Sequence, residues 1–266
     1  MDLFLKEGKS FMKLTRFLIG EGTCGCDAKW GLVEDNKIKT AKGCFCSAFK
    51  PTGEEYLLEE VQLLAQVEPG KIVGLGMNYR AVADAKGIPY PPEPILFMKP
   101  ISSIIGPGAE IELPENVKQP AFEAEIAVVI GKPAKNVSIE AAATHIFGFT
   151  LSNDLTAKDY IENSYPTTKS KSFDTFTPIG PFVVDGLEAQ NIDFGASVNG
   201  EEKQKGNTSG MIFAIAEQIS YISKFMTLYP GDVILTGTPP GAGAFKVGDQ
   251  IMIASEKIGT LENRVK

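Results

Sequence analysis

Short apolar runs, each followed by a turn signal, dominate the chain from Lys71 onward. Such runs are typical of buried strands, and the glycine and proline between them favour turns. The segments predicted as strands are residues 71–75, 95–98, 126–130, 146–151, 182–184, 233–236 and 250–253. Many short strands joined by such turns predict a barrel or a sandwich, so we expect a mainly β fold with a few helices.

Two segments carry a helical pattern instead. They are residues 138–145 and residues 211–225, and in the second Ile212, Ile215, Ile219 and Ile222 fall on one face. This isoleucine stripe indicates a face turned to the core rather than a surface for a partner. Residues 78–94 are polar and rich in proline, which predicts a mobile loop or lid.

The first part of the chain indicates a smaller β-rich module. Residues 30–34 and 37–40 flank the turn signal Asp35-Asn36, which predicts a hairpin. Residues 57–65 read as a short connecting strand or helix, and Pro69-Gly70 marks a boundary. We therefore predict a small N-terminal module at residues 1–70, with residues 1–11 as an extension if the chain starts functionally at Met12, and a second domain at residues 71–266.

Charge and hydropathy argue against two kinds of partner. The 266 residues include 26 Lys and Arg against 33 Asp and Glu, a formal net charge of −7. The basic residues are scattered, whereas a nucleic-acid backbone requires a clustered positive field, so we expect no nucleic-acid partner. No apolar segment is long enough to span a bilayer, and the N-terminus lacks the features of a signal peptide. These observations predict a cytoplasmic protein with no membrane partner.

Candidate chemistry lies at the start of a strongly apolar strand. Glu123 and Glu125 are at positions i and i+2, so on a strand they point to the same side, roughly 7 Å apart at Cβ. Two like charges beside a buried strand are unfavourable unless a cation lies between them. Asp154 ends another apolar strand, and three hard oxygen donors suit Mg²⁺, Mn²⁺ or Ca²⁺ rather than Zn²⁺. For the two glutamates alone, a solvated strand end with Asp154 capping a turn is the competing interpretation.

Further motifs follow one another around these carboxylates. They are Asn78-Tyr79 after Gly74-Leu75-Gly76, Lys99-Pro100, Asn153-Asp154-Leu155-Thr156-Ala157-Lys158-Asp159, Lys171-Ser172-Phe173-Asp174, Gln204, and Thr236-Gly237-Thr238-Pro239. In this order the set closely resembles the fumarylacetoacetate hydrolase family, densely over residues 71–266 and weakly over residues 12–70. The pattern is most similar to that of 2-hydroxyhepta-2,4-diene-1,7-dioate isomerases and acylpyruvate hydrolase-like members.

The resemblance implies a fold, an assembly and a set of site residues. The catalytic core at residues 71–266 is expected to be a β-roll or twisted β-sandwich, and members of the family usually form homodimers. The resemblance places Mg²⁺ or Mn²⁺ on Glu123, Glu125 and Asp154, and a catalytic lysine at Lys171. The substrate-binding groups that it implies are Thr238, Gly237, Lys158, Tyr79 and Gln204.

These residue types suit a small 2-oxo acid, which chelates a metal through its carboxylate and its keto oxygen. The metal then acts as a Lewis acid that stabilises an enolate. The Lys171 ammonium, close to three carboxylates, should stay charged and support the same developing negative charge. Enolate stabilisation serves C–C hydrolysis, decarboxylation and keto–enol isomerisation alike.

The chain departs from the family's hydrolases at the residues that activate water. Their His-x-x-Glu is matched here by Val82 and Ala85, and the one histidine of the chain, His145, is expected to be structural. Asp84, in the predicted lid, could serve as an alternative base or be a plain exposed carboxylate.

Two further replacements point away from hydrolysis. Lys158 stands where the family has arginine and loses its bidentate fork, and Ile161 stands where it has glutamine and loses a donor. We therefore predict a metal-dependent isomerase or decarboxylase acting on a small 2-oxo or 2-hydroxydienoic acid. One alternative is an acylpyruvate or fumarylacetoacetate-type C–C hydrolase. Another, from a different class, is a non-catalytic family member with a binding or structural role.

Four cysteines form two C-x-C pairs that are symmetric about Asp35. A hairpin at Asp35-Asn36 would bring these pairs side by side, where four thiolates could hold a structural Zn²⁺. Free thiols are an equally open interpretation, and disulfides are the least favoured in a reducing cytoplasm. The four residues are Cys24, Cys26, Cys44 and Cys46.

Overall fold

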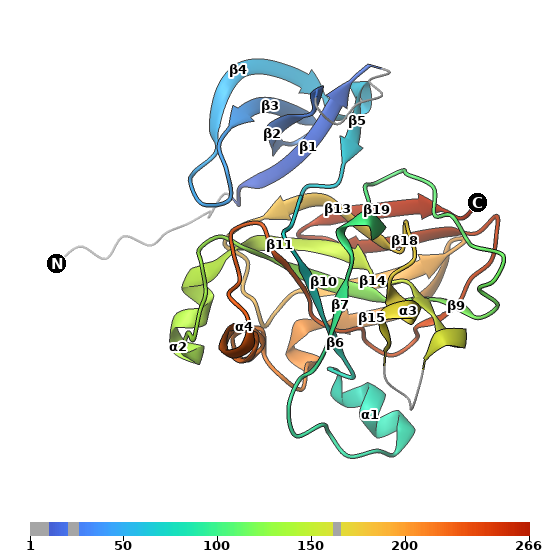
Figure 1. The fold of residues 1–266 in the computed structure, drawn as a ribbon. Helices are drawn as coiled ribbons and strands as arrows, with labels where there is room; N and C mark the ends of the chain where they lie inside the picture. The colour runs from blue at the N-terminus through green and yellow to red at the C-terminus, as the bar shows by residue number, and fades with distance from the viewer. Residues whose placement is uncertain (1–10, 21–26, 162–165) are drawn as a thin grey trace.

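Strands dominate the structure, a computed structural model that describes residues 11–20, 27–161 and 166–266. The largest sheet has the order β4-β3-β2-β1-β13-β11-β10-β16-β6-β7, with β5 paired to β1 and β8 paired to β13 (Figure 1). Its strands are β1 (Lys13–Ile19), β2 (Lys29–Glu34), β3 (Lys37–Lys42), β4 (Lys50–Leu57), β5 (Val61–Leu64), β6 (Ile72–Gly76), β7 (Ile95–Lys99), β8 (Ile104–Ile105), β10 (Ala124–Ile130), β11 (Ile146–Asn153), β13 (Thr177–Val184) and β16 (Val233–Leu235).

Two smaller sheets and a few short helices complete the described part. The sheet β12-β9-β17 contains β9 (Pro120–Phe122), β12 (Thr156–Ala157) and β17 (Gly243–Ala244). The sheet β15-β14-β18-β19 contains β14 (Asp193–Val198), β15 (Glu201–Asn207), β18 (Gln250–Ser255) and β19 (Gly259–Arg264). The helices are α1 (Arg80–Lys86), α2 (Ile139–Ala142), α3 (Thr168–Lys171) and α4 (Ile215–Phe225), and 3₁₀ turns lie at Leu58–Glu60, Ile101–Ser103, Ala143–His145, Lys158–Tyr160 and Thr208–Gly210. None of the described helices has the length and apolar character needed to cross a membrane.

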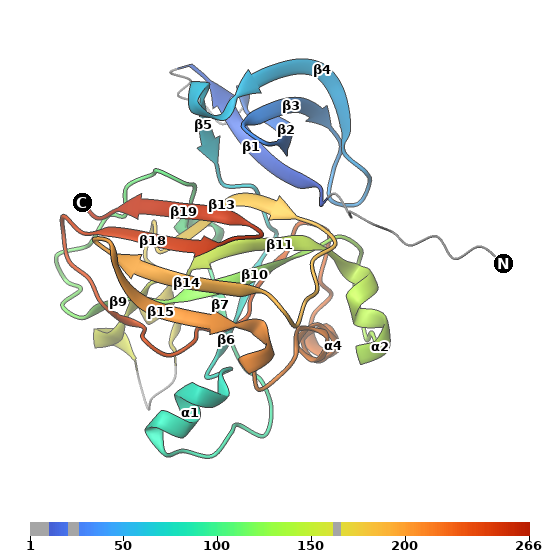
Figure 2. The same ribbon diagram turned by 180° about the vertical axis from the view of Figure 1, so that it is seen from behind.

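The central strand β10 is buried on both of its faces. Ile126, Val128 and Ile130 point into the larger hydrophobic core, which is shared with α4 and with the sheet β15-β14-β18-β19 (Figure 2). Ala127 and Val129 point into a second core on the opposite face. Burial on both faces explains why this segment is apolar without interruption, where a half-exposed strand would alternate.

The first strands cover the second face of the large sheet. β1 pairs antiparallel with β13, and β1–β5 form the blue unit above the rest of the molecule in Figure 1. Aromatic rings fill the junction: the centroid of Phe45 lies 4.9 Å from that of Phe147, and Trp30 lies 5.2 Å from Phe49. The separation into a module at residues 1–70 and a domain at residues 71–266 stays a prediction, and the packing shows that the two parts share a core.

Most of the elements expected from the apolar pattern are present. Each predicted strand is observed within a few residues of its expected bounds, and the hairpin is confirmed by the register that places Glu34 opposite Lys37. The second predicted helix begins at Ile215 rather than at residue 211. Met211 instead forms a bridge with Tyr79, and the Glu217 side chain accepts the Ala214 N–H at 2.6 Å, which starts the helix there.

The prediction of a loop throughout residues 78–94 is wrong, because this segment contains α1. Alanines favour a helix here, and Gly87 ends it in the left-handed conformation with φ 63°. Ala83 is fully buried, which anchors the helix to the body of the protein. A helix of 7 residues, about two turns, between polar and proline-rich flanks is too short to show a helical period in the sequence.

Candidate active site

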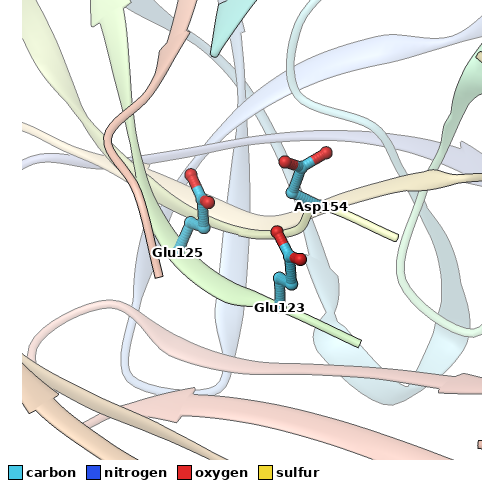
Figure 3. Close-up of side chains that lie close together, drawn as sticks. All are labelled: Glu123, Glu125 and Asp154. Atoms are coloured by element: carbon cyan, nitrogen blue, oxygen red, sulfur yellow. The ribbon is translucent and has the colours of Figure 1, made fainter. Parts of the chain in front are cut away.

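Three carboxylates meet where β10 and β11 run side by side. The strands are antiparallel with Ala124 opposite Asn153, so the start of β10 lies beside the end of β11. At the break between β9 and β10, the Glu123 N–H donates to Asn153 Oδ1 at 3.0 Å and the Glu123 carbonyl accepts the Asp154 N–H at 2.9 Å. Figure 3 shows the side chains of Glu123, Glu125 and Asp154 turned toward one another, and one oxygen of each lies within 4.8 Å of the others.

Lys171, the last residue of α3, lies against two of these carboxylates. Its Nζ donates to Glu123 Oε2 at 2.8 Å and to Asp154 Oδ2 at 2.5 Å, and it lies 4.8 Å from the centre of the Phe97 ring. Burial alone would lower the pKa of Lys171, but the Asp154, Glu123 and Glu125 carboxylates raise it above its ordinary value. The ammonium predicted from the sequence is therefore maintained by its surroundings.

A second buried lysine, Lys99, was not among the predicted site residues. Its side chain is fully buried, with Nζ 2.6 Å from Asp154 Oδ1 and a hydrogen bond of 3.2 Å to the Leu155 carbonyl. Burial lowers the pKa of Lys99, and Asp154 partly offsets this effect. In the sequence Lys99 stood only within the Lys99-Pro100 motif of the family resemblance, and a lysine at the end of an apolar strand is more often solvated than buried.

The pKa values of Glu125 and Asp154 are shifted in opposite directions, although burial acts on both in the same way. Burial raises the pKa of Glu125 well above its ordinary value, and the nearby Asp154 charge adds to the rise. Burial alone would also raise the pKa of Asp154, but Lys171 and Lys99 hold it below its ordinary value. The site thus contains one well-paired carboxylate and one that lacks a positive partner.

The charges and donor atoms of this cluster fit a divalent cation. Three carboxylates face two ammonium groups, which leaves one negative charge in a largely buried place. A divalent cation would change that net charge to one positive charge, which complements an anionic substrate. The oxygen-only donor set suits Mg²⁺ or Mn²⁺. The residues present therefore fit the metal predicted from the sequence.

A loop after β16 holds Glu125 from the other side. The Gly237 N–H donates to Glu125 Oε2 at 2.8 Å, and Thr238 Oγ1 donates to the Ala124 carbonyl at 2.9 Å. Gly237 has φ +100°, and a Cβ added there would lie 2.8 Å from the Cβ of Asn78. Glycine is required here both by the backbone conformation and by the close approach.

Two buried amides support this loop. Gln204 Oε1 accepts the Ala124 N–H at 2.9 Å, while its Nε2 donates to Thr238 Oγ1 at 2.8 Å and to the Pro239 carbonyl at 2.7 Å. Asn78 Nδ2 donates to the Thr236 carbonyl at 2.8 Å. Gln204, which was predicted to bind the substrate, thus lies behind this loop with its amide bonded to protein groups. Asn78 is a supporting residue that was not among the predicted site residues.

The cluster forms the base of a cavity of about 350 Å³. Glu123, Glu125 and Lys171 line it from below, and Thr238 lines one wall. The remaining described lining comes from β6, α1, β7 and residues 239–242, together with Met77, Thr156, Lys158, Ile161 and Pro166. The side chains that α1 and β7 contribute are Val82, Ala85, Lys86 and Phe97. Such a volume is within the ordinary range for a small-molecule site.

Two family descriptions match the sequence one after the other. The C-terminal region of fumarylacetoacetate (FAA) hydrolases matches residues 71–266, and a family described as Rv2993c-like, N-terminal, matches residues 12–65. The chain belongs to the fumarylacetoacetate hydrolase family. The family and the mainly β fold predicted from the ordered motifs are confirmed.

Members of this family that resemble the chain carry names of different reactions. A 2-hydroxyhepta-2,4-diene-1,7-dioate isomerase from Mycobacterium marinum is 36% identical over 96% of this chain and 98% of its own, with a TM-score of 0.86. A fumarylacetoacetate hydrolase from Exiguobacterium antarcticum is 30% identical over 96% and 99%, with a TM-score of 0.85. The human protein named oxaloacetate tautomerase FAHD2A, mitochondrial, is 42% identical over 219 residues, which are 77% of this chain and 70% of that protein.

The two positions that carry the histidine and the glutamate of His-x-x-Glu in the family's hydrolases lie on α1, and both line the cavity here. Val82 and Ala85 line it with apolar groups. Asp84, the alternative base considered from the sequence, is exposed and is not among the described lining residues. Its Oδ1 accepts a hydrogen bond from the Tyr90 hydroxyl at 3.0 Å. Asp84 therefore lies on the side of α1 away from the carboxylates.

Tyr79 lies in the core rather than in the cavity lining. It is 3% exposed and packs against Phe194, with ring centroids 6.5 Å apart. Burial raises the pKa of Tyr79, and the charge of Glu125 adds to this. Among the described residues its hydroxyl has no hydrogen-bond partner. The structure thus places it behind the carboxylates, where it could affect Glu125 but does not line the space for a substrate.

His145 and the described cysteines lie apart from the carboxylates. His145 precedes β11 at the end opposite Asp154, and its Nδ1 is 3.4 Å from the Lys132 carbonyl. Cys44 and Cys46 are exposed and form no disulfide, and Cys44 Sγ lies 3.2 Å from Ser47 Oγ. Cys24 and Cys26 lie outside the described residues, so the predicted zinc site stays a prediction.

Proposed function

We propose that this chain is a divalent-metal-dependent enzyme that isomerises or decarboxylates a small 2-oxo or 2-hydroxydienoic acid. The observation that carries the proposal is the buried carboxylate triad beside Lys171 at the base of a cavity. A buried cluster of this charge has little structural value without a cation, because ionised carboxylates lose hydration on burial.

Different residues of the site would bind the metal, bind the substrate and stabilise the negative charge that develops on it. Glu123, Glu125 and Asp154 would hold Mg²⁺ or Mn²⁺, which when bound supplies Lewis-acid polarisation of the 2-oxo group. Lys171 would donate a hydrogen bond to the substrate oxygen that gains negative charge as the enol proton leaves. Thr238 lines the cavity and is proposed to receive the substrate carboxylate, while Gly237 beside it donates its N–H to Glu125.

The apolar face of α1 favours isomerisation or decarboxylation over hydrolysis. Val82 and Ala85 have no group that could take a proton from water. Keto–enol isomerisation needs no water as a reactant, and decarboxylation also passes through an enolate, that of the product one carbon shorter, formed by loss of CO₂. The names of the similar proteins, an oxaloacetate tautomerase and a dienedioate isomerase, support this choice. The hydrolase that shares the fold supports C–C hydrolysis as the second candidate.

Several finer expectations stay predictions. The choice between Mg²⁺ and Mn²⁺, the homodimer and the cytoplasmic location are inferred from the sequence and from the family resemblance. The relatives give no single compartment, since the human tautomerase is named as mitochondrial.

The experiment that tests the proposal compares three reactions in one buffer. Oxaloacetate, an acylpyruvate and a 2-hydroxydienedioate would each be followed with Mg²⁺, with Mn²⁺ and with chelator. We expect metal-dependent isomerisation or decarboxylation with little acylpyruvate hydrolysis. Hydrolysis as the main activity would favour the second candidate. Metal binding without turnover of any of the three would indicate a non-catalytic member of the family.

A further inference from the structure

We propose that Lys86 on α1, together with Lys158, which lines the same cavity, binds a second anionic group of the substrate and makes the site selective for 2-oxo diacids. This inference rests on the proposed function and extends it to the distal end of the substrate. The candidate specificity residue is Lys86, which the sequence did not single out.

The charged groups of the cavity lie at two different depths. Glu125 and Lys171 are buried at its base, whereas Lys86 and Lys158 are exposed, so their ammonium groups belong to the solvent side. Beyond the base, these two lysines are the only charged residues among the described lining residues. The wall between the two levels is apolar and includes Phe97, Val82 and Ile161.

Helix geometry directs Lys86 over the cavity. Lys86 follows Val82 by four residues, so both occupy one face of α1, while Asp84 lies on another face with Tyr90. Lys86 Nζ lies 3.6 Å from the sulfur of Met77, which also lines the cavity. Met77 has a left-handed φ of 56°, an uncommon conformation for a residue with a side chain.

Neither lysine has an ion-pair partner within the described part of the chain. The nearest acidic neighbour of Lys158 in sequence, Asp159, is already occupied: its Oδ2 accepts the N–H groups of Lys118 and Gln119 at 2.8 and 2.7 Å. The carboxylates that line the cavity, Glu123 and Glu125, lie at its base, so two exposed ammonium groups without an ion-pair partner are complementary to an added anion. An apolar wall between this pair and the metal ligands fits a short carbon chain with an acid at each end.

The test compares two substrates of equal chain length that differ only at the distal end. They are 2-oxoglutarate and 2-oxopentanoate, and exchange of their C3 hydrogens for deuterium in D₂O with Mn²⁺ can be followed by NMR. Wild-type protein should prefer the diacid. Lys86→Met should lower the ratio of kcat/KM for the diacid to that for the monoacid about tenfold, mainly through KM, and Lys86→Glu should lower it further.

The control is Lys132→Met, which removes an exposed lysine near His145, outside the cavity. This variant should keep the wild-type ratio. An unchanged ratio in Lys86→Met and Lys158→Met, with active wild-type protein, would overturn the distal-anion site and leave the proposed function standing. Absence of metal-dependent exchange with either substrate, together with no turnover in the three-reaction comparison, would overturn the proposed function and this inference with it.

Discussion

Glu125 is the member of the carboxylate triad that most clearly needs a cation. No lysine contacts it among the described residues, and its one hydrogen bond comes from the Gly237 backbone. Lys171 and Lys99 are instead grouped around Asp154. The raised pKa of Glu125 reflects this imbalance, because burial disfavours a charge that has no direct partner.

Replacing Glu125 by glutamine should remove metal binding and change how stability depends on pH. The pKa of Glu125 is raised in the folded protein, so in wild-type protein without metal the unfavourable charge is absent at low pH and develops as pH rises through that pKa. Glu125→Gln removes this effect and keeps an acceptor for the Gly237 N–H. Its stability relative to wild type should therefore be greater at pH 8 than at pH 5.

Thermal unfolding at both pH values, with and without Mn²⁺, checks this prediction. Mn²⁺ should stabilise wild type and not Glu125→Gln. Glu140→Gln, on the exposed surface of α2, is the control for loss of a carboxylate outside the site and should keep the wild-type stabilisation by Mn²⁺. Equal stabilisation of Glu125→Gln by Mn²⁺ would contradict the role of Glu125 as a ligand.

Lys99→Met should destabilise the metal-free protein by about 3–5 kcal/mol, because it removes one partner of a fully buried ion pair. A bound cation would partly replace the missing charge, so Mn²⁺ should raise the melting temperature more in this variant than in wild type. Denaturant unfolding and thermal scans measure both effects. Lys71→Met, which breaks the Lys71–Asp232 pair away from the site, should leave the response to Mn²⁺ unchanged. An equal rise in melting temperature with Mn²⁺ in Lys99→Met and wild type would contradict the idea that the cation replaces the missing charge of Lys99.

At the scale of single residues, the sequence indicated the three clustered carboxylates better than the groups that hold them in place. Glu123 and Glu125 stand out because two acids at the edge of an apolar strand are unusual. Lys99 gave no comparable signal, since burial of a strand-terminal lysine depends on α3 and β11 arriving from distant parts of the chain. Gln204 was expected to bind the substrate, but its amide oxygen accepts the Ala124 N–H and its amide nitrogen donates to Thr238. Only the three-dimensional arrangement shows these bonds.

The loop after β16 is the element that sets the position of Glu125 and Thr238. Gly237→Ala should force this loop to move, because the added Cβ meets the Asn78 side chain. We expect a loss of about 1–3 kcal/mol in stability from the positive φ, together with weaker metal binding and lower activity.

Gly248 offers a control for backbone strain alone. It has φ +92°, but a Cβ there would have no heavy atom within 4 Å. Gly248→Ala should therefore lose a similar amount of stability and keep wild-type metal binding, as measured by titration with Mn²⁺. Equal metal affinity in Gly237→Ala and Gly248→Ala would show that the Gly237 contact does not support the site.

Elements with a strong period or an uninterrupted apolar run were predictable, and short or polar ones were not. β10, β11 and α4 carry such patterns. β15 was missed because its sequence, Glu201–Asn207, is polar and mostly exposed, and its pairing with β14 defines it as a strand. α1 was missed because so short a helix shows no clear hydrophobic period. It is held by contacts with the rest of the protein, such as the burial of Ala83.

At the scale of the whole molecule, the N-terminal strands and the catalytic sheet depend on each other. β1 extends the sheet through β13, and Ile179 and Val183 are buried beneath the N-terminal residues Leu14 and Phe49. The sequence indicated the boundary near residue 70 but not this shared core, since pairing between distant strands leaves no local trace.

Removal of residues 1–70 should therefore expose an apolar face and leave an aggregation-prone fragment. Size-exclusion chromatography and thermal unfolding of residues 71–266 would measure this effect. A monodisperse fragment with the melting temperature of the whole chain would show that the second domain is independent of the first.

The most direct test of metal-dependent enolate chemistry is the rate at which the enol of oxaloacetate converts to the keto form, followed by the loss of its ultraviolet absorbance. We predict acceleration by wild-type protein with Mg²⁺ or Mn²⁺, and a rate equal to that without protein when chelator is added or when Glu125→Gln is used. An undiminished rate with chelator or in that variant would contradict the assignment of the triad as the metal site of the reaction.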